Sequence, residues 1–299
     1  MGRLRPLTME LSPLSSLAEE LRAVQSLLLV WLALGLALEA GMRALRRLPG
    51  YEPRAIVHAF EHWSVMELGR FLTVGLRLSA FHAVAAWAPL RLASNALVVC
   101  LAFVLVDLVY YLRHRWMHAT PLGRALHEPH HASRRMTLLA SIRLGWAQRL
   151  VDDFFYLPLL LLGFDPTLLF VTIEVNHAVP LWCHTDAVGR LPWLDPWLNT
   201  PSNHRVHHAA DEALRNRNLG AASMLWDRLF GTYEREPEGG VARFGLGAGD
   251  RGDGVLAQQL APLVCYARSL GRRSPEGASV KAVISAACRK TPKVLPVTK

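Results

Sequence analysis

The stretch from residue 95 to 118, NALVVCLAFVLVDLVYYLRHRWMH, joins a strongly apolar segment directly to a pair of histidines. Its apolar part, residues 95–112, approaches the about 20 residues that a membrane-spanning helix needs. Helical spacing places four polar residues in one stripe: Asp107, Tyr111, His114 and His118. An acid within an apolar span is costly and usually serves a function. The stretch therefore predicts a membrane helix that carries polar side chains to one membrane face.

The composition of the whole chain also indicates a membrane protein. Only 19% of its 299 residues are charged, 52% are hydrophobic, and the mean hydropathy is +0.20. The net charge of +9 suits Lys and Arg residues that flank membrane spans on the cytoplasmic side. No nucleic-acid fold signature accompanies this charge, so we expect no nucleic-acid partner. The four cysteines contain no CxxC pair, which argues against a cysteine zinc site.

Three further apolar segments, residues 26–44, 68–90 and 150–183, extend the membrane prediction along the chain. The last is broken by GFDP at 163–166, which predicts a hairpin of two spans or a re-entrant pair. Basic clusters place the histidine-bearing face and the C-terminus in the cytoplasm: Arg46–Arg47, Arg113–Arg115 and Arg134–Arg135. The fold class expected is all-α, a polytopic integral membrane helical bundle with a cytoplasmic-face helical cap that carries the histidines. In a bacterium this would be the inner membrane.

The same reading divides the chain into four regions. Residues 1–25 form an N-terminal segment, and residues 26–105 contain the first membrane spans. Residues 106–235 carry the histidine clusters and the hairpin at 150–183. Residues 236–299 form a glycine-rich linker and a basic C-terminal tail, with a peripheral amphipathic helix expected over residues 255–270.

Eight of the thirteen histidines fall into three clusters: His114 and His118; His127, His130 and His131; His204, His207 and His208. Spacings of three and four residues place a cluster on one helix face, where it can offer two or three imidazoles to one centre. Neutral imidazole suits divalent iron, zinc, copper and nickel. Eight ligands exceed the four of a tetrahedral zinc ion and fit two adjacent metal ions. Threefold recurrence of the pattern argues against unrelated surface or helix-capping histidines.

Further residues are candidates around this centre. His184, in LWCHTD, lies where the second apolar block returns to the cytoplasm, level with the clusters, and is a plausible ninth ligand. Glu174 and His177 share one helix face and either supply another ligand or pair with each other. Asp107 would accept a ring N–H from a ligand histidine or hydrogen-bond to Tyr111.

Prolines predict where two of the histidine-bearing helices begin. Pro129 suits a first helical turn, so a helix is expected to begin near Glu128, with His127 in the preceding loop. In NTPSNHRVHH (199–208), Thr200 is the expected N-cap and Pro201 the first helical residue. The three histidines of this stretch would follow on that helix.

Together these motifs resemble the membrane fatty acid hydroxylase/sterol desaturase family, and most closely its alkylglycerol monooxygenase branch. The resemblance covers residues 106–234 and rests, in order, on VDLVYYLRHRWMH, HEPHHAS, WCHTD, NTPSNHRVHH and MLWDRLFGTYE. It implies that residues 106–235 are a catalytic region with a non-haem di-iron centre. The implied ligands are His114, His118, His127, His130, His131, His184, His204, His207 and His208. Supporting side chains are expected at Asp107, Tyr111, Asn199 and Asp227.

The resemblance also implies the reaction and its partners. It implies an O2-dependent oxidoreductase that hydroxylates or desaturates a lipid chain, or cleaves an ether after hydroxylation. The chain shows no electron-donor domain, so an external electron donor or small reductant is expected beside the lipid, O2 and the membrane. One departure from the family pattern is NRNLGA, which puts Asn216 and Leu219 where the family often has Asp and Tyr.

Two alternatives stay open at this point, a zinc-dependent membrane hydrolase and a metal-binding membrane protein without redox chemistry. A metal carrier would need ligands deep in the spans, whereas most histidines here lie at one predicted membrane face. A zinc hydrolase would need an open site with fewer ligands and a carboxylate base.

Overall fold

The computed structural model describes residues 12–246 and 254–270, which form helices and loops without a strand. Most of the predicted segment 1–25 and of the basic tail lie outside the residues whose side chains are described. The α-helices are α1 Ser12–Leu45, α2 Pro53–Ala85, α3 Ala96–Ala119, α4 Pro121–His131, α5 Leu138–Ser141, α6 Arg149–Asp152, α7 Leu157–Leu161, α8 Pro166–Ala178, α9 Pro201–His207, α10 Leu225–Leu229 and α11 Val255–Leu270. Short 3-10 helices follow at η1 Asp153–Phe155, η2 Val179–Cys183 and η3 Glu212–Leu214.

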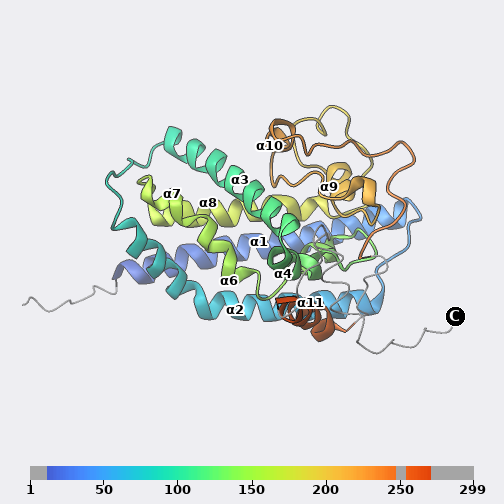
Figure 1. Cartoon of the computed structure of the whole chain (residues 1–299), viewed down its shortest axis with the longest axis horizontal. Helices are drawn as coiled ribbons and strands as arrows, with labels where there is room; N and C mark the ends of the chain where they lie inside the picture. Colours follow the sequence, from blue (N-terminus) through green and yellow to red (C-terminus); the bar gives the residue numbers. More distant parts are fainter. Residues whose placement is uncertain (1–11, 247–253, 271–299) are drawn as a thin grey trace, which may run out of the picture.

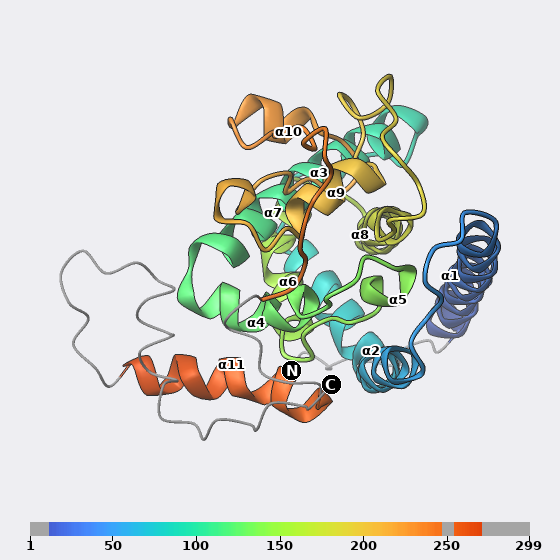
Figure 2. The same ribbon diagram turned by 90° about the vertical axis from the view of Figure 1, so that its right-hand side faces the viewer.

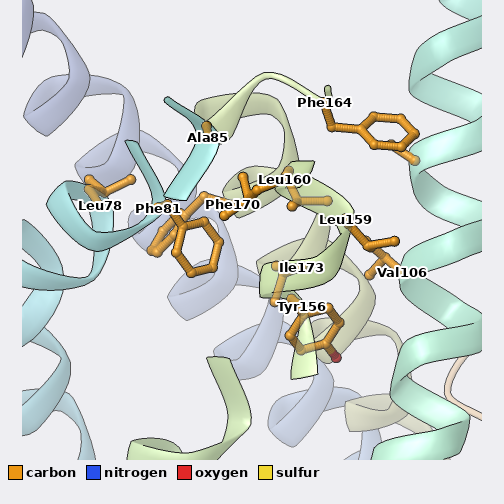
Figure 3. Packing of buried hydrophobic residues seen from close by; sticks show 12 residues of the cluster. Leu78, Phe81, Ala85, Val106, Tyr156, Leu159, Leu160, Phe164, Phe170 and Ile173 are labelled. Carbon is orange, nitrogen blue, oxygen red and sulfur yellow. The ribbon is translucent and has the colours of Figure 1, made fainter. Parts of the chain in front are cut away.

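The helices α1 and α2 run along most of the length of the molecule (Figure 1). The helix α3 and the hairpin of α7 and α8 lie toward one end, and α4, α9, α10 and α11 gather toward the other. A buried apolar core joins α2, α3, α7 and α8, and the rings of Phe81 of α2 and Phe170 of α8 lie with their centroids 6.0 Å apart (Figure 3). Its buried members are Leu78, Phe81, Ala85, Ala102, Val106, Tyr156, Leu159, Leu160, Phe164, Leu169, Phe170 and Ile173. This core fixes the hairpin against the helix that carries the first histidine pair.

The break predicted at GFDP is the turn of the hairpin. Gly163 has a φ of +96°, and a Cβ there would lie 2.7 Å from the carbonyl oxygen of Leu90. Asp165 then caps α8, because its side chain accepts a hydrogen bond from the amide of Leu168. The thirteen residues of α8 rise only about 20 Å, which is less than the about 30 Å of a bilayer core.

Within the described residues, one helix is long and apolar enough to cross a membrane, namely α3. Asn95 caps its start, and the helix continues past the predicted end at Leu112 to include both histidines of its cluster. α2 is longer but carries Arg70 and Arg77, which form ion pairs with Glu174 of α8. The predicted polytopic arrangement of several spans therefore stays a prediction.

The start predicted for the helix around Pro129 is wrong. α4 begins at Pro121, and Thr120 caps it by accepting a hydrogen bond from the amide of Gly123 at 3.1 Å. Pro129 lies inside α4, two residues before its end, where its missing N–H removes one of the backbone hydrogen bonds of the last turns. His127 is consequently on the helix and not in the preceding loop.

One other expectation from surface patterns is corrected, and a second is made more specific. Arg113 is not a surface charge, because its side chain is only 4% exposed and pairs with Asp152 of α6. The predicted helix over residues 255–270 forms as α11, which lies at the edge of the molecule and packs one face against α4 (Figure 2). In both cases a partner distant in sequence buries the residues concerned.

Candidate metal centre

A sharp corner between α3 and α4 brings the first two histidine clusters face to face. Thr120 forms it, since its amide bonds to the carbonyl of Trp116 while its hydroxyl caps α4. A Cβ at Gly123 would lie 2.5 Å from the Cα of Met117, so the close approach of the two helices requires glycine here.

The third cluster lies on α9 as predicted. The side chain of Thr200 accepts a hydrogen bond from the amide of Asn203, and Pro201 occupies the first turn. Asn203 also donates to the carbonyl oxygens of Asp195 and Leu198, which holds the preceding loop against the helix start. His204 and His207 lie on this helix, and His208 caps its end.

The structure brings all nine predicted histidines together in two groups. One group contains His114, His118, His127, His131 and His207, and the other contains His130, His184, His204 and His208. Within each group the available ligand atoms lie within 4.8 Å of one another. The groups adjoin, because the rings of His131 and His208 stack with centroids 4.4 Å apart. Each of the three clusters contributes to the five-histidine group, and the second and third also contribute to the four-histidine group.

Inside each group the Nε2 atoms converge. The Nε2 atoms of His114 and His127 are 3.0 Å apart in the five-histidine group. In the four-histidine group, Nε2 of His204 lies 2.9 Å from that of His184 and 3.1 Å from that of His208. Two nitrogens each about 2.1 Å from a shared ion, at about a right angle, are about 3.0 Å apart. The spacing therefore fits imidazoles that share a metal ion.

The outward ring nitrogens fix this orientation. For six of the nine histidines, Nδ1 donates a hydrogen bond to an oxygen: His114 to Leu219, His118 to Asn216, His127 to Gln148, His130 to Arg143, His184 to Pro180 and His207 to Arg217. A proton on Nδ1 leaves the lone pair on Nε2 facing the centre, which is the tautomer that binds a metal.

The electrostatics of the site favour neutral imidazole. Burial lowers the pKa of His184 and of His207 to about 4. Burial, with neighbouring imidazoles as the smaller cause, lowers the pKa of His130 and His208 well below the usual range. The Nε2 atoms of His118, His131 and His207 are buried without a hydrogen-bond partner, which a coordinated ion would supply. Histidine donors of this kind fit divalent iron as well as zinc.

Among the predicted supporting residues, Asp227 holds the loop residue whose carbonyl accepts a hydrogen bond from His114. It accepts hydrogen bonds from the amides of Leu219 and Gly220, each at 2.7 Å, and the carbonyl of Leu219 receives Nδ1 of His114. Asn199 donates to the carbonyl of Gly220, so it ties the start of α9 to the same loop. Burial raises the pKa of Asp227.

Asp107 has different partners from the two that the sequence suggested. It accepts hydrogen bonds from Asn176, Ala222, Ser223 and Trp226, and from neither a clustered histidine nor Tyr111. It therefore fastens α3 to α8 and to the loop before α10. The hydroxyl of Tyr111 pairs instead with Thr232 at 2.9 Å, and its ring stacks on Phe230.

Glu174 and His177 lie outside both histidine groups. Glu174 forms ion pairs with Arg70, Arg77 and Arg149. His177 contacts Arg149 at 3.1 Å through Nδ1 and the hydroxyl of Tyr156 at 3.0 Å through Nε2. The two residues do not pair with each other by hydrogen bond, but share Arg149.

Sequence reasoning missed the oxygens that hold the ligands. Four of the six are main-chain carbonyls, which carry no side-chain signal. Gln148 follows His127 by twenty-one residues with no motif to mark it. A signal did exist at NRN, since Asn216 and Asn218 have φ of 59° and 53°, a conformation that Asn tolerates better than most residues. This turn presents both Asn216 and the carbonyl of Arg217 to the histidines.

A glutamate inside the predicted span 26–44 also reaches the site. Glu39 of α1 is 1% exposed, and it accepts hydrogen bonds from the hydroxyl of Thr185 at 2.6 Å and the amide of Leu138 at 2.8 Å. Thr185 follows His184 directly in the chain. The end of α1 is thereby anchored to the segment that carries one of the nine histidines.

Comparison with known proteins agrees with the residues that built this site. The family model of the fatty acid hydroxylases matches residues 99–232, a range that contains all nine histidines. The chain is 38% identical over 146 residues to the alkylglycerol monooxygenase of Danio rerio and 36% identical over 137 residues to that of Homo sapiens. These matches cover 49% and 46% of this chain but only 32% and 31% of those relatives.

A bacterial relative matches over a longer stretch. The chain is 30% identical over 173 residues to the ornithine lipid hydroxylase OlsE of Rhizobium tropici, covering 56% of this chain and 50% of that protein. The chain thus spans a third to a half of the curated relatives that it matches. No solved structure matches it. The family resemblance drawn from the histidine motifs is confirmed: residues 99–232 match the fatty acid hydroxylase family model, and the same part of the chain is similar to alkylglycerol monooxygenases.

Proposed function

We propose that the protein is a membrane-bound oxidoreductase that uses O2 and two non-haem iron ions to hydroxylate or desaturate a lipid, or to cleave it after hydroxylation. The observation that carries this proposal is the division of nine histidines, eight of them buried, into two adjoining groups with their Nε2 atoms turned inward. Five and four imidazoles exceed what one ion can bind, and they suit a pair of ions.

Bound iron would supply the O2-dependent cleavage of an unactivated C–H bond, chemistry that side chains do not provide. The chain's own share is to hold and orient. Outward Nδ1 bonds keep six of the nine rings in the metal-binding tautomer, and the burial of His204 and His207, each 2% exposed, excludes bulk water. Asp227 and Asn199 hold the loop whose carbonyl orients His114.

The lipid substrate is proposed from the family match and from the apolar surface of the long helices. Phe71 and Leu76 of α2 and Leu97 of α3 are each about three-quarters exposed, at 75%, 73% and 76%. Apolar side chains exposed along long helices suit contact with lipid. We propose that the acyl or alkyl chain approaches from the bilayer, while an external donor or small reductant supplies electrons.

We also propose where the protein lies in the cell and how its chain divides into regions. Residues 26–105 would contain the membrane spans and residues 106–235 the catalytic region, with its hairpin at 150–183 and the linker and tail at 236–299. The basic residues near the domain support a catalytic face in the cytoplasm. Appending a reporter after residue 246 and testing its accessibility in sealed membrane vesicles checks this orientation.

A zinc hydrolase is less well supported, because it needs a carboxylate base and the three candidate carboxylates have other partners. Asp107, Asp227 and Glu174 accept bonds from loop amides or pair with arginines, as described above. The test is metal analysis with O2 consumption on the full chain purified in detergent under reducing conditions. Two irons per chain and lipid-dependent O2 uptake, lost in His207→Ala, are expected. Stoichiometric zinc with activity and no O2 uptake would overturn the proposal.

A further inference from the structure

The helix α11 lies outside the matched domain, and two adjacent glutamines fasten it to the loop at 143–148. Gln259 accepts a hydrogen bond from the amide of Trp146 at 2.8 Å and donates to the carbonyl of Leu144 at 2.8 Å. Its amide nitrogen also lies 2.7 Å from Nδ1 of His62 on α2. Gln258 accepts a hydrogen bond from the guanidinium of Arg143 at 2.6 Å. Both glutamines are nearly inaccessible, at 4% and 3% exposure.

The loop held in this way is itself in contact with the histidine-bearing helix α4. A Cβ at Gly145 would lie 2.0 Å from the carbonyl oxygen of Leu126, so loop and helix backbones touch directly beside His127. At its two ends the loop orients histidines: the carbonyl of Arg143 accepts from His130, and the side chain of Gln148 accepts from His127. His127 belongs to the five-histidine group and His130 to the four-histidine group. One short loop therefore orients one histidine of each group.

We propose that Gln258 and Gln259 of α11 are positioning residues for both halves of the metal centre, acting through the loop at 143–148. The inference rests on the proposed metal binding and assigns a part of that site to a segment beyond the domain. The glutamines touch no clustered histidine. They fix the place of the oxygens to which His127 and His130 donate.

The hydrogen bonds of the two glutamines indicate that they position the loop and do not merely cover α4. Apolar side chains at 258 and 259 would cover α4 equally well, but they would leave the loop free to shift along it. An amide that accepts from Trp146 and donates to Leu144 fixes the register of the loop backbone, because both bonds are made together. Removing the side-chain amide of Gln259 leaves the buried amide of Trp146 and carbonyl of Leu144 unpaired. The loop would then move slightly to find new partners for these groups, and this movement would change the orientation of the histidines.

The test compares Gln259→Met, Gln258→Met and Val255→Ala with the unaltered full chain in detergent. Met keeps a similar volume and removes the amide, whereas Val255→Ala removes buried apolar volume at the start of α11 and none of the glutamine hydrogen bonds to the loop. Metal binding is measured with Fe2+ and with Co2+ alone, whose visible absorption reports the number and geometry of its ligands. Unfolding temperature is measured in parallel.

We expect Gln259→Met to weaken metal binding about tenfold, the lower end of the effect of losing a group that orients a ligand, and to change the Co2+ spectrum. Gln258→Met, which removes the acceptor of the Arg143 guanidinium, should give a smaller change in the same direction. Val255→Ala should lower the unfolding temperature and leave affinity and spectrum unchanged.

Three results would count against the inference. Unchanged affinity and spectrum in both glutamine variants would overturn it while leaving the proposed function intact. An equal loss of affinity in Val255→Ala would show that α11 acts by packing alone. Absence of metal binding by the unaltered chain would overturn both the inference and the proposed function.

Discussion

Nδ1 of His114 lies 2.7 Å from the carbonyl oxygen of Leu219, although 105 residues separate them in the chain. Leu219 is 1% exposed, and its amide is held in turn by Asp227. The orientation of a histidine on α3 thus depends on a carboxylate near the end of the domain.

This relationship predicts a loss of metal affinity in Asp227→Asn. An amide cannot accept from both Leu219 and Gly220 on its two sides, so the loop should shift and release His114 from its acceptor. We expect metal binding to weaken by about tenfold and the free energy of unfolding to fall by about 1–3 kcal/mol. Metal titration and chemical unfolding of the purified chain measure the two effects. Unaltered metal affinity would contradict the role given to Asp227.

Asp107→Asn is the matched control, since it alters another buried carboxylate that accepts several hydrogen bonds. Its donors, which include Ser223 and Trp226, are not partners of the clustered histidines. We expect a comparable loss of about 1–3 kcal/mol in stability but a smaller loss of metal affinity than in Asp227→Asn. Equal losses of affinity would mean that any loosening of this region disturbs the site.

Glu174→Gln tests whether this residue is a ligand or an ion-pair partner. Gln keeps the shape of the side chain but leaves Arg70, Arg77 and Arg149 without their shared carboxylate. Breaking a buried ion pair from one side costs about 3–5 kcal/mol, so we expect a marked drop in unfolding temperature. The number of metal ions bound per chain should not change. Loss of one ion from an otherwise folded variant would instead identify Glu174 as a ligand.

The lowered histidine pKa values predict how the metal-free protein responds to acid. In the folded chain His184 and His207 have a pKa of about 4, whereas unfolded histidine titrates near 6.5. Between these values the unfolded state binds protons that the folded state excludes, so stability falls as the pH drops from about 6.5 to 4. Thermal unfolding across this range checks the prediction, and bound metal should delay the fall. A flat profile between pH 7 and 5 would contradict it.

The sequence predicted best where a feature is local. Spacing within each cluster was sufficient to place His204, His207 and His208 at one short helix, because Thr200 and Pro201 define its start. It was also sufficient to suggest two ions, since the number of imidazoles exceeds the needs of one. The division of the nine histidines into a group of five and a group of four could not be predicted from the sequence. Neighbouring histidines of one sequence cluster, such as His130 and His131, belong to different groups.

Features that depend on tertiary contacts were not predictable in the same way. The helix start was predicted wrongly near Pro129 because α4 begins eight residues earlier, at Pro121, with Thr120 as its N-cap. Arg113 looked like a surface charge because its partner Asp152 is thirty-nine residues away. Most of the oxygens that accept hydrogen bonds from Nδ1 of the histidines are main-chain carbonyls. Their positions depend on how the loops fold, which the sequence does not reveal. The same holds for Gln258 and Gln259, which gain a role only from the loop beside them.

The donor set around the centre has a consequence for its charge. Both groups consist of neutral imidazoles, and no carboxylate is part of either group in the portion of the chain that the structure describes. Such a shell would donate electron pairs to bound cations but would cancel none of their positive charge. In a buried environment that charge would be poorly screened, so it would stabilise a bound anion such as hydroxide. It would also make metal ions held there easier to reduce than ions held by carboxylates.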